Sequence, residues 1–103
     1  MSFFVDIADC HLEYLRDRAG LTPEGFGRLR VSIAAILENC TDAFREERRT
    51  EPPPEGNQPS TYFEVTHVFP DAGRVYLVRL IVNDSAAAYG VLRVVFVDCT
   101  SSP

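Results

Sequence analysis

The stretch "GRVYLVRLIVND", from Gly73 to Asp84, has the composition of a buried β-strand with one cation, Arg79, in its middle. Valine, isoleucine, leucine and tyrosine make up most of it, and β-branched and aromatic side chains favour strands. The face of the sheet on which Arg79 lies decides whether this arginine only stabilises the fold or also takes part in function.

Two further segments show the same alternation of side chains with a period of two residues. Together with the central strand they predict a three-stranded antiparallel meander. They are "TYFEVTHVF" (61–69) before the central strand, here taken as 74–82, and "GVLRVVFVD" (90–98) after it. "PDAG" between the first two has the composition of a tight turn, which predicts a hairpin. The connection "NDSAAAY" between the last two is longer and rich in small residues.

The N-terminal half predicts a short strand followed by two helices. Residues 2–7 are rich in Phe, Val and Ile. Asp9 is expected to cap a first helix that ends at Gly20. Thr22 then fits the N-cap of a second helix, with Pro23 at its first position.

The second helix has a clear apolar stripe. Its members recur at spacings of three and four: Phe26, Leu29, Ile33, Ile36, Leu37, Cys40 and Phe44. The helix either runs to about Arg48 or breaks near "NCTD", where Thr41 would cap a new turn. The two helices should form an αα-hairpin.

The proline-rich segment "TEPPPEGNQPS" (50–60) is expected to be a connecting loop, because three consecutive prolines exclude a helix and a ladder strand. A chain of 103 residues is long enough for a single core and too short for two, which predicts one domain, 1–103. The predicted class is α+β: a short N-terminal strand, an αα-hairpin, then a three-stranded antiparallel meander with the helices packed on one sheet face.

Charge, cysteine content and apolar runs limit the classes of function that the sequence favours. The net charge is −5 and all ten cations are arginine, so nucleic-acid binding would depend on a local arginine cluster. The three cysteines have no CxxC pair, which indicates neither a disulfide framework nor a zinc site, and no cofactor is expected. There is no membrane-length apolar run and no signal-peptide pattern, which predicts a cytoplasmic protein without membrane contact.

Alternation along the strands assigns side chains to the two sheet faces. If "PDAG" sets Phe69 opposite Arg74, one face is nearly all apolar. This face should receive the helices, and its expected members are Phe63, Val65, His67, Tyr76, Val78, Leu80, Val82, Leu92, Val94 and Phe96. The other face is expected to hold Tyr62, Glu64, Thr66, Arg79 and Arg93.

On the uncovered face, Arg79 should lie opposite Glu64 with Arg93 nearby. One interpretation is a solvated cross-strand ion pair. A second is a functional arginine pair that binds a phosphate or carboxylate, with Glu64 as acid or base. A third is a face buried in a homodimer, because Val, Leu and Ile surround the charges.

Three other residues are side candidates. Tyr62 could stack on a base, and Thr66 would lie beside the charged residues. His67 falls on the helix-covered face beside Tyr76, where a core or rim histidine is the more frequent case.

The element order and two short motifs resemble the RelE/ParE superfamily of bacterial toxins from toxin–antitoxin operons. "GRVYLVRLIVND" is similar to the family's "G-x-(Y/R)-x-(V/I)-x-Y" hairpin strand, and "VLRVVFVD" is similar to its closing "VLRV" strand. The resemblance covers nearly the whole chain in element order. The resemblance implies either the ribonuclease branch, whose exposed sheet face binds messenger RNA at the ribosome, or the branch that inhibits gyrase and does not need the nuclease residues.

By position, the resemblance implies Glu64 as a general base, Arg79 as a phosphate-stabilising group, and Arg93 as a second source of positive charge. Tyr62 and Thr66 would contact the substrate. The cognate partner would be an antitoxin.

Two departures count against RNA cleavage. The chain is acidic and lacks lysine, and its end, "DCTSSP", lacks the His, Tyr or Arg that completes the acid/base set in many members. The expected action is therefore protein or RNA binding through the exposed sheet face. The alternative is a non-toxic homodimeric or partner-binding α+β module.

Overall fold

The computed structural model describes residues 2–51 and 61–102. Its strands are β1 (Phe4–Ile7), β2 (Arg49–Thr50), β3 (Tyr62–Asp71), β4 (Arg74–Asn83) and β5 (Val91–Ser102). Its helices are α1 (Asp9–Glu13), the π-helical turn η1 (Tyr14–Arg18), α2 (Pro23–Glu38), α3 (Asp42–Glu46) and the 3₁₀ turn η2 (Ala87–Tyr89).

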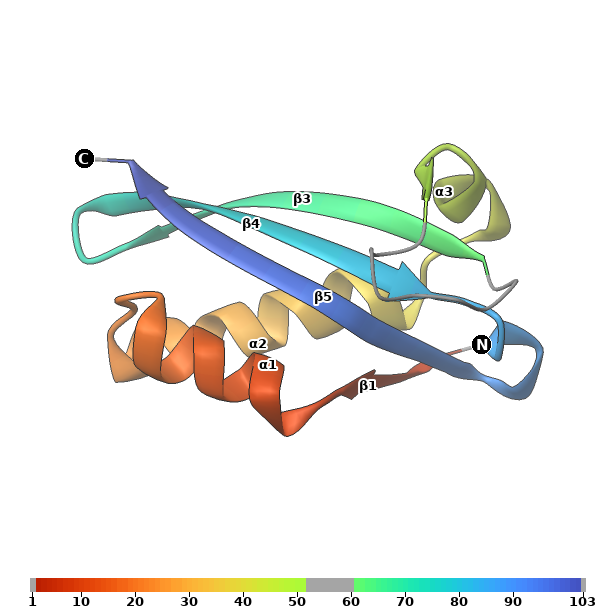
Figure 1. The fold of residues 1–103 in the computed structure, drawn as a ribbon, viewed down its shortest axis with the longest axis horizontal. Helices are drawn as coiled ribbons and strands as arrows, with labels where there is room; N and C mark the ends of the chain where they lie inside the picture. The colour runs from red at the N-terminus through yellow and green to blue at the C-terminus, as the bar shows by residue number, and fades with distance from the viewer. Residues whose placement is uncertain (1, 52–60, 103) are drawn as a thin grey trace.

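The five strands form one mixed sheet in the order β1-β5-β4-β3-β2, and α1 and α2 lie on one side of it (Figure 1). The α+β class is confirmed, and the predicted meander is present as β3–β4–β5. The sheet is wider than predicted by one strand at each edge. β1 pairs in parallel with residues 91–94, and β2 pairs with residues 62–63. Thr50, expected in the loop, is therefore in a strand, while residues 52–60 lie outside the described ranges.

The β3–β4 hairpin turns tightly at Ala72 and Gly73, and this sets the register. Both residues have positive φ, 50° and 79°, as in the two-residue turns that match strand twist. Asp71 consequently pairs with Arg74, whereas Phe69 was expected there. The pairing differs from the prediction by two residues, so every side chain of the hairpin keeps its predicted face.

A β-bulge in β5 changes the predicted face of one residue. The register shifts between Ile81 and Val82, which pair with Phe96 and Val94, so Val95 is the extra residue. Phe96 therefore lies on the uncovered face with Ile81, and the prediction that it faces the helices was wrong.

The helices confirm one cap and correct another. The Thr22 hydroxyl accepts a hydrogen bond from the Gly25 N–H at 3.0 Å, as an N-cap should. Asp9 does not cap α1, because Ala8 is in the cap position and no side chain bonds there. The second helix ends at Glu38, and Thr41 caps α3 through the Phe44 N–H, so the alternative with a break is correct.

The core lies between the sheet and two helical segments, α2 and the continuous stretch formed by α1 and η1. The fully buried side chains from the helices are Leu15, Leu29, Ile33 and Leu37, and those from the strands are Phe63, Tyr76, Val78, Leu80, Val82, Leu92 and Val94. Their burial fixes which side of the sheet faces α1 and α2, and the other side is not covered by these helices. In the ranges 2–51 and 61–102, no helix is both long and apolar enough to cross a membrane.

Candidate binding face

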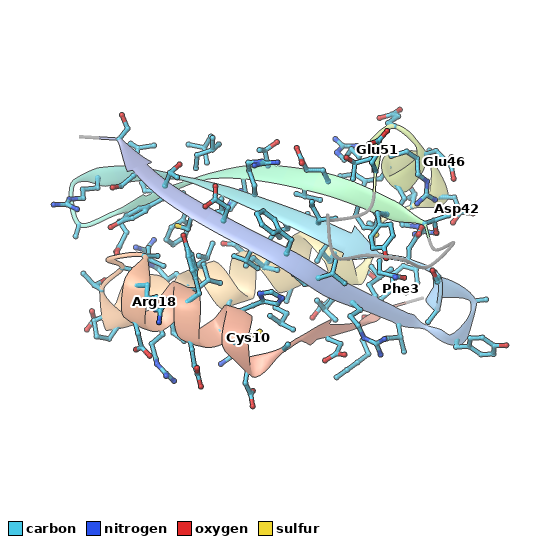
Figure 2. All side chains as sticks on the ribbon, viewed as in Figure 1. Phe3, Cys10, Arg18, Asp42, Glu46 and Glu51 are labelled. Atoms are coloured by element: carbon cyan, nitrogen blue, oxygen red, sulfur yellow. The ribbon has the colours of Figure 1, made fainter. Side chains whose placement is uncertain are left out.

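The sheet side opposite α1 and α2, here called the open face, presents both charged and apolar side chains (Figure 2). Its members on the three long strands are Tyr62, Glu64, Thr66, Val68, Val75, Leu77, Arg79, Ile81, Phe96, Asp98, Thr100 and Ser102. Asp6 on β1 and Arg93 on β5 extend it toward the β1 edge.

Arg79 and Glu64 form the predicted ion pair on this face. An Nη2–Oε1 distance of 2.8 Å joins them, although Glu64 pairs with Ile81 and Arg79 pairs with Thr66 across the strands. The contact is thus diagonal, within reach of two long side chains. Both side chains remain about one-third or more exposed, at 33% and 40%.

A second carboxylate flanks the same arginine. Asp98 lies directly opposite Arg79 on β5, and the Phe96 ring centroid is 5.9 Å from the guanidinium carbon. The hydrogen bond to Glu64, with a smaller effect of Asp98, raises the pKa of Arg79. Two acids therefore surround one cation, and the immediate site is not electropositive.

Arg93 does not join this group, which corrects the prediction that it lies near Arg79. It is opposite Asn83, four residues along β4 from Arg79, or about 13 Å at the usual rise per strand residue. Its Nε bonds Asp6 at 3.0 Å across the parallel β1–β5 pair. The sequence could not place this partner, because parallel pairing with the first strand was not foreseen.

The other candidate residues from the sequence differ in how exposed their side chains are. Thr66 is exposed, as expected, whereas Tyr62 is only 6% exposed and offers little ring surface for stacking. His67 lies on the helix-covered side as predicted, but opposite Val78, and its ring is 6.1 Å from that of Phe69.

An apolar patch occupies the hairpin end of the open face. Val68, Val75 and Leu77 are 63%, 48% and 42% exposed, unlike the apolar residues of the opposite face. They border a shallow hollow with Thr100 and Ser102 at the end of β5. Exposed apolar side chains in contact with one another are the usual mark of a protein-binding surface.

The sequence reasoning missed a charged cluster at the start of α2. Asp71, at the end of β3, accepts hydrogen bonds from the Thr22 N–H at 2.9 Å and from the Thr22 hydroxyl at 3.0 Å. Arg28 bonds the same carboxylate at 3.0 Å. The Thr22 N–H is the main reason that the pKa of Asp71 is lowered. This carboxylate fills the anion position at the helix N-terminus.

A second missed cluster joins α3 and β2 to the end of β4. Buried Asp84 accepts from Arg45 Nε at 3.1 Å and from Arg49 Nη1 at 2.9 Å, and the Thr61 hydroxyl also contacts it. Arg45 is itself buried and also contacts Asp42, which Figure 2 labels on α3. The sequence signal was present in "FREERR" and "ND", but the partners are 35 to 39 residues apart.

Neither cluster resembles a metal centre. Among the described residues, no three His, Cys, Asp or Glu side chains come together in a way that would hold a metal ion. Each cluster is centred on one carboxylate, Asp71 or Asp84, whose oxygens are already bonded by arginine, threonine or backbone donors. We therefore assign both clusters a structural role.

A comparison with protein-family models, with curated proteins and with solved structures returned no match to this chain.

Proposed function

We propose that this chain is a toxin-type protein of a toxin–antitoxin system, a diverged relative of the RelE/ParE proteins, that binds a protein partner through its open face. The observation that supports binding over RNA cleavage is the position of Arg79 between Glu64 and Asp98. A phosphate that approaches this arginine would meet two carboxylates, and Glu64 already uses an oxygen to hold the cation.

The distance to Arg93 supports the same proposal. A transferring phosphate needs several cations that converge on one point. Arg93 is about 13 Å from Arg79 along the sheet and bonds Asp6 instead. In the described part of the open face, these two arginines therefore act as separate ion pairs.

The apolar patch supports a protein partner. Val68, Val75 and Leu77 lie beside exposed Thr66 and Thr100, a mixture of apolar centre and polar rim that is typical of protein interfaces. By the family resemblance, the partner would be an antitoxin or a target such as gyrase. The protein would act in the cytoplasm.

The test is growth of a bacterial host after induction of the wild type and of two folded double variants. We expect the wild type and Glu64→Ala/Arg79→Ala to arrest growth, and Val68→Ser/Leu77→Ser to lose the arrest. Circular dichroism and soluble yield control for folding. Arrest that disappears only in Glu64→Ala/Arg79→Ala, together with cleaved messenger RNA, would replace this proposal by the endoribonuclease one.

A wild type that is soluble and does not arrest growth would contradict the toxin-type role. The alternative would then be a homodimer through the open face, which the exposure of Val75 and Leu77 also favours. Sedimentation equilibrium separates the two, because a homodimer would show a mass that rises with concentration and that falls to the monomer value in Leu77→Ser.

A further inference from the structure

The outer edge of β3 has unpaired backbone groups between two blocked positions. The Glu64 N–H donates to the Arg48 carbonyl at 2.9 Å, so even-numbered residues of β3 direct their backbone groups away from β4. Thr66 and Val68 point the same way, and β2 pairs only with residues 62 and 63. No described residue pairs with the outward N–H and C=O groups of Thr66 and Val68.

Pro70 ends this free stretch. It is the next outward position and has no N–H, and its carbonyl is 3.4 Å from Arg28 Nη2. At Thr66 and Val68 the free edge therefore presents four backbone groups, two donors and two acceptors, between the Arg48–Glu64 bond and Pro70.

A hollow with apolar and charged lining residues lies next to this edge on the helix side. It is lined by Glu24, Gly27, Arg28, Val31, Ser32 and Phe69, of which the last is on β3 and the others are on α2. Val31 is 69% exposed, and a Cβ at Gly27 would meet no atom within 4 Å. The hollow is therefore open space beside the strand. Val31 and Gly27 give it an apolar side, and the Arg28 guanidinium carbon lies 5.0 Å from the Phe69 ring centroid within it.

We propose that the β3 edge binds a short extended segment of another protein as an added strand, with an apolar side chain directed into the α2 hollow. A strand antiparallel to β3 would form four hydrogen bonds with Thr66 and Val68. Its residues opposite His67 and Phe69 lie on the helix side, which directs them toward Val31 and Gly27. The partner must supply an extended backbone, because only N–H and C=O groups at strand spacing can pair with all four outward groups of Thr66 and Val68.

A second copy of this chain does not fit the same edge. A two-fold axis between copies makes the two β3 strands antiparallel. Pairing centred on His67 would place Pro70 of the second copy opposite Glu64, where Arg48 already bonds. Pairing centred on Val68 would place Pro70 of the second copy opposite Thr66, where an N–H is needed. The edge therefore selects a short strand from a different protein.

The free chain offers a first test by amide hydrogen exchange followed by NMR. We expect the Thr66 and Val68 amides to exchange faster than those of Val65 and His67, whose N–H groups face β4. Equal protection of all four amides would show that the edge is already covered, and would overturn the proposal.

The binding test uses a phage-displayed library of random seven-residue peptides, selected on the full chain. We expect enriched peptides with apolar residues at alternate positions, and at least about tenfold protection of the Thr66 and Val68 amides by the best synthetic peptide. The same peptide with N-methyl groups on alternate backbone nitrogens keeps its side chains and should lose binding. Failure to enrich any such peptide counts against the proposal.

Two variants of the protein locate the site independently. Val68→Pro removes one outward N–H, and Val31→Glu puts a charge at the exposed rim of the hollow, so each should weaken binding about fivefold or more. Phe4→Ser is the matched control, because Phe4 is an exposed apolar residue on β1 at the opposite edge of the sheet, and this variant should bind like the wild type. Equal binding to all three folded variants would overturn the proposal, whatever the outcome for the open face.

Discussion

The charged residues of the open face and those of the two buried clusters form ion pairs of opposite kinds. Glu64 and Arg79 meet at 2.8 Å but stay partly in water. Asp84 meets Arg45 and Arg49 at similar distances, and its side chain is only 4% exposed. Burial decides the difference, because a solvated pair contributes little to stability whereas a buried charge depends on its partners.

This contrast separates the residues that tolerate change from those that maintain the fold. We expect Arg79, the arginine that draws attention in the sequence, to tolerate substitution without loss of the fold, because its pair with Glu64 is partly solvated. Arg45 and Asp84 are unremarkable in the sequence, yet both are buried charges, and loss of the pair between them would remove the buried acidic partner of Arg45.

The largest expected effect comes from Asp84→Asn. The amide cannot neutralise Arg45 and Arg49, which keep the exposed Asp42 and Glu46 as acidic partners. We therefore expect the free energy of unfolding to fall by about 3 kcal/mol, the lower end for a broken buried pair. The melting temperature should fall by about 15 °C or more for a domain of this size. Thermal unfolding followed by circular dichroism measures it.

The control for Asp84→Asn is Glu64→Gln, an equally conservative change of a paired carboxylate. We expect its melting temperature to stay within about 2 °C of the wild type. If the two variants melted together, the division between buried and open-face pairs would be wrong.

An intermediate effect is expected at the Asp71 cluster, where two glycines of the same helix give a matched pair. A Cβ at Gly25 would lie 2.3 Å from the Asp71 carboxyl carbon, and that carboxylate is held by Thr22 and Arg28. Gly25→Ala should therefore destabilise by about 1–3 kcal/mol through overpacking. Gly27→Ala meets open space and should stabilise by about 0.5–1 kcal/mol.

Urea unfolding of both variants measures the difference. A stabilised Gly25→Ala protein would mean that the hairpin end and α2 are not in contact as described. A neutral Gly27→Ala would instead point to a helix interior that is less regular than α2.

Much of the fold followed from local signals in the sequence. Period-two alternation located β3, β4 and β5, and the Thr22–Pro23 pair located the start of α2. The two-residue error in register at Gly73 did not change the faces, because the side-chain period is also two.

The features that were missed depend on contacts between distant residues. The parallel pairing of β1 with β5 places Asp6 beside Arg93, 87 residues away, and no local pattern encodes it. The bulge at Val95 interrupts a run of apolar residues in which either face suits every side chain, so alternation could not reveal that Phe96 turns over. For the candidate site, the Glu64–Arg79 pair was predictable from parity, whereas Asp98 as a second neighbour was not.

The smallest expected effect is the dependence of stability on acid pH, to which both Asp71 and Asp84 contribute. The Thr22 N–H lowers the pKa of Asp71 below its ordinary value of 3.8, against the opposing effect of burial. At Asp84 burial alone would raise the pKa, but hydrogen bonds from Arg49 and Thr61 outweigh it, and the pKa is also lowered. Both carboxylates thus hold their protons less tightly in the folded chain than in the unfolded one.

The sign of the effect follows from linkage. Between the folded and unfolded pKa values the unfolded chain binds more protons, so stability rises with pH in this range. The contribution is complete above about pH 4 to 5 and is lost as the pH falls through the folded values. Asp71→Asn should be less stable than the wild type at pH 7, and the difference should shrink as the pH falls through the lowered pKa of Asp71. Arg28→Gln should keep most of the pH dependence, because it leaves the Thr22 N–H in place. Urea unfolding from pH 7 to 2.5 measures all three proteins, and an Asp71→Asn protein with the wild-type pH slope would show that this carboxylate does not depend on the helix N-terminus.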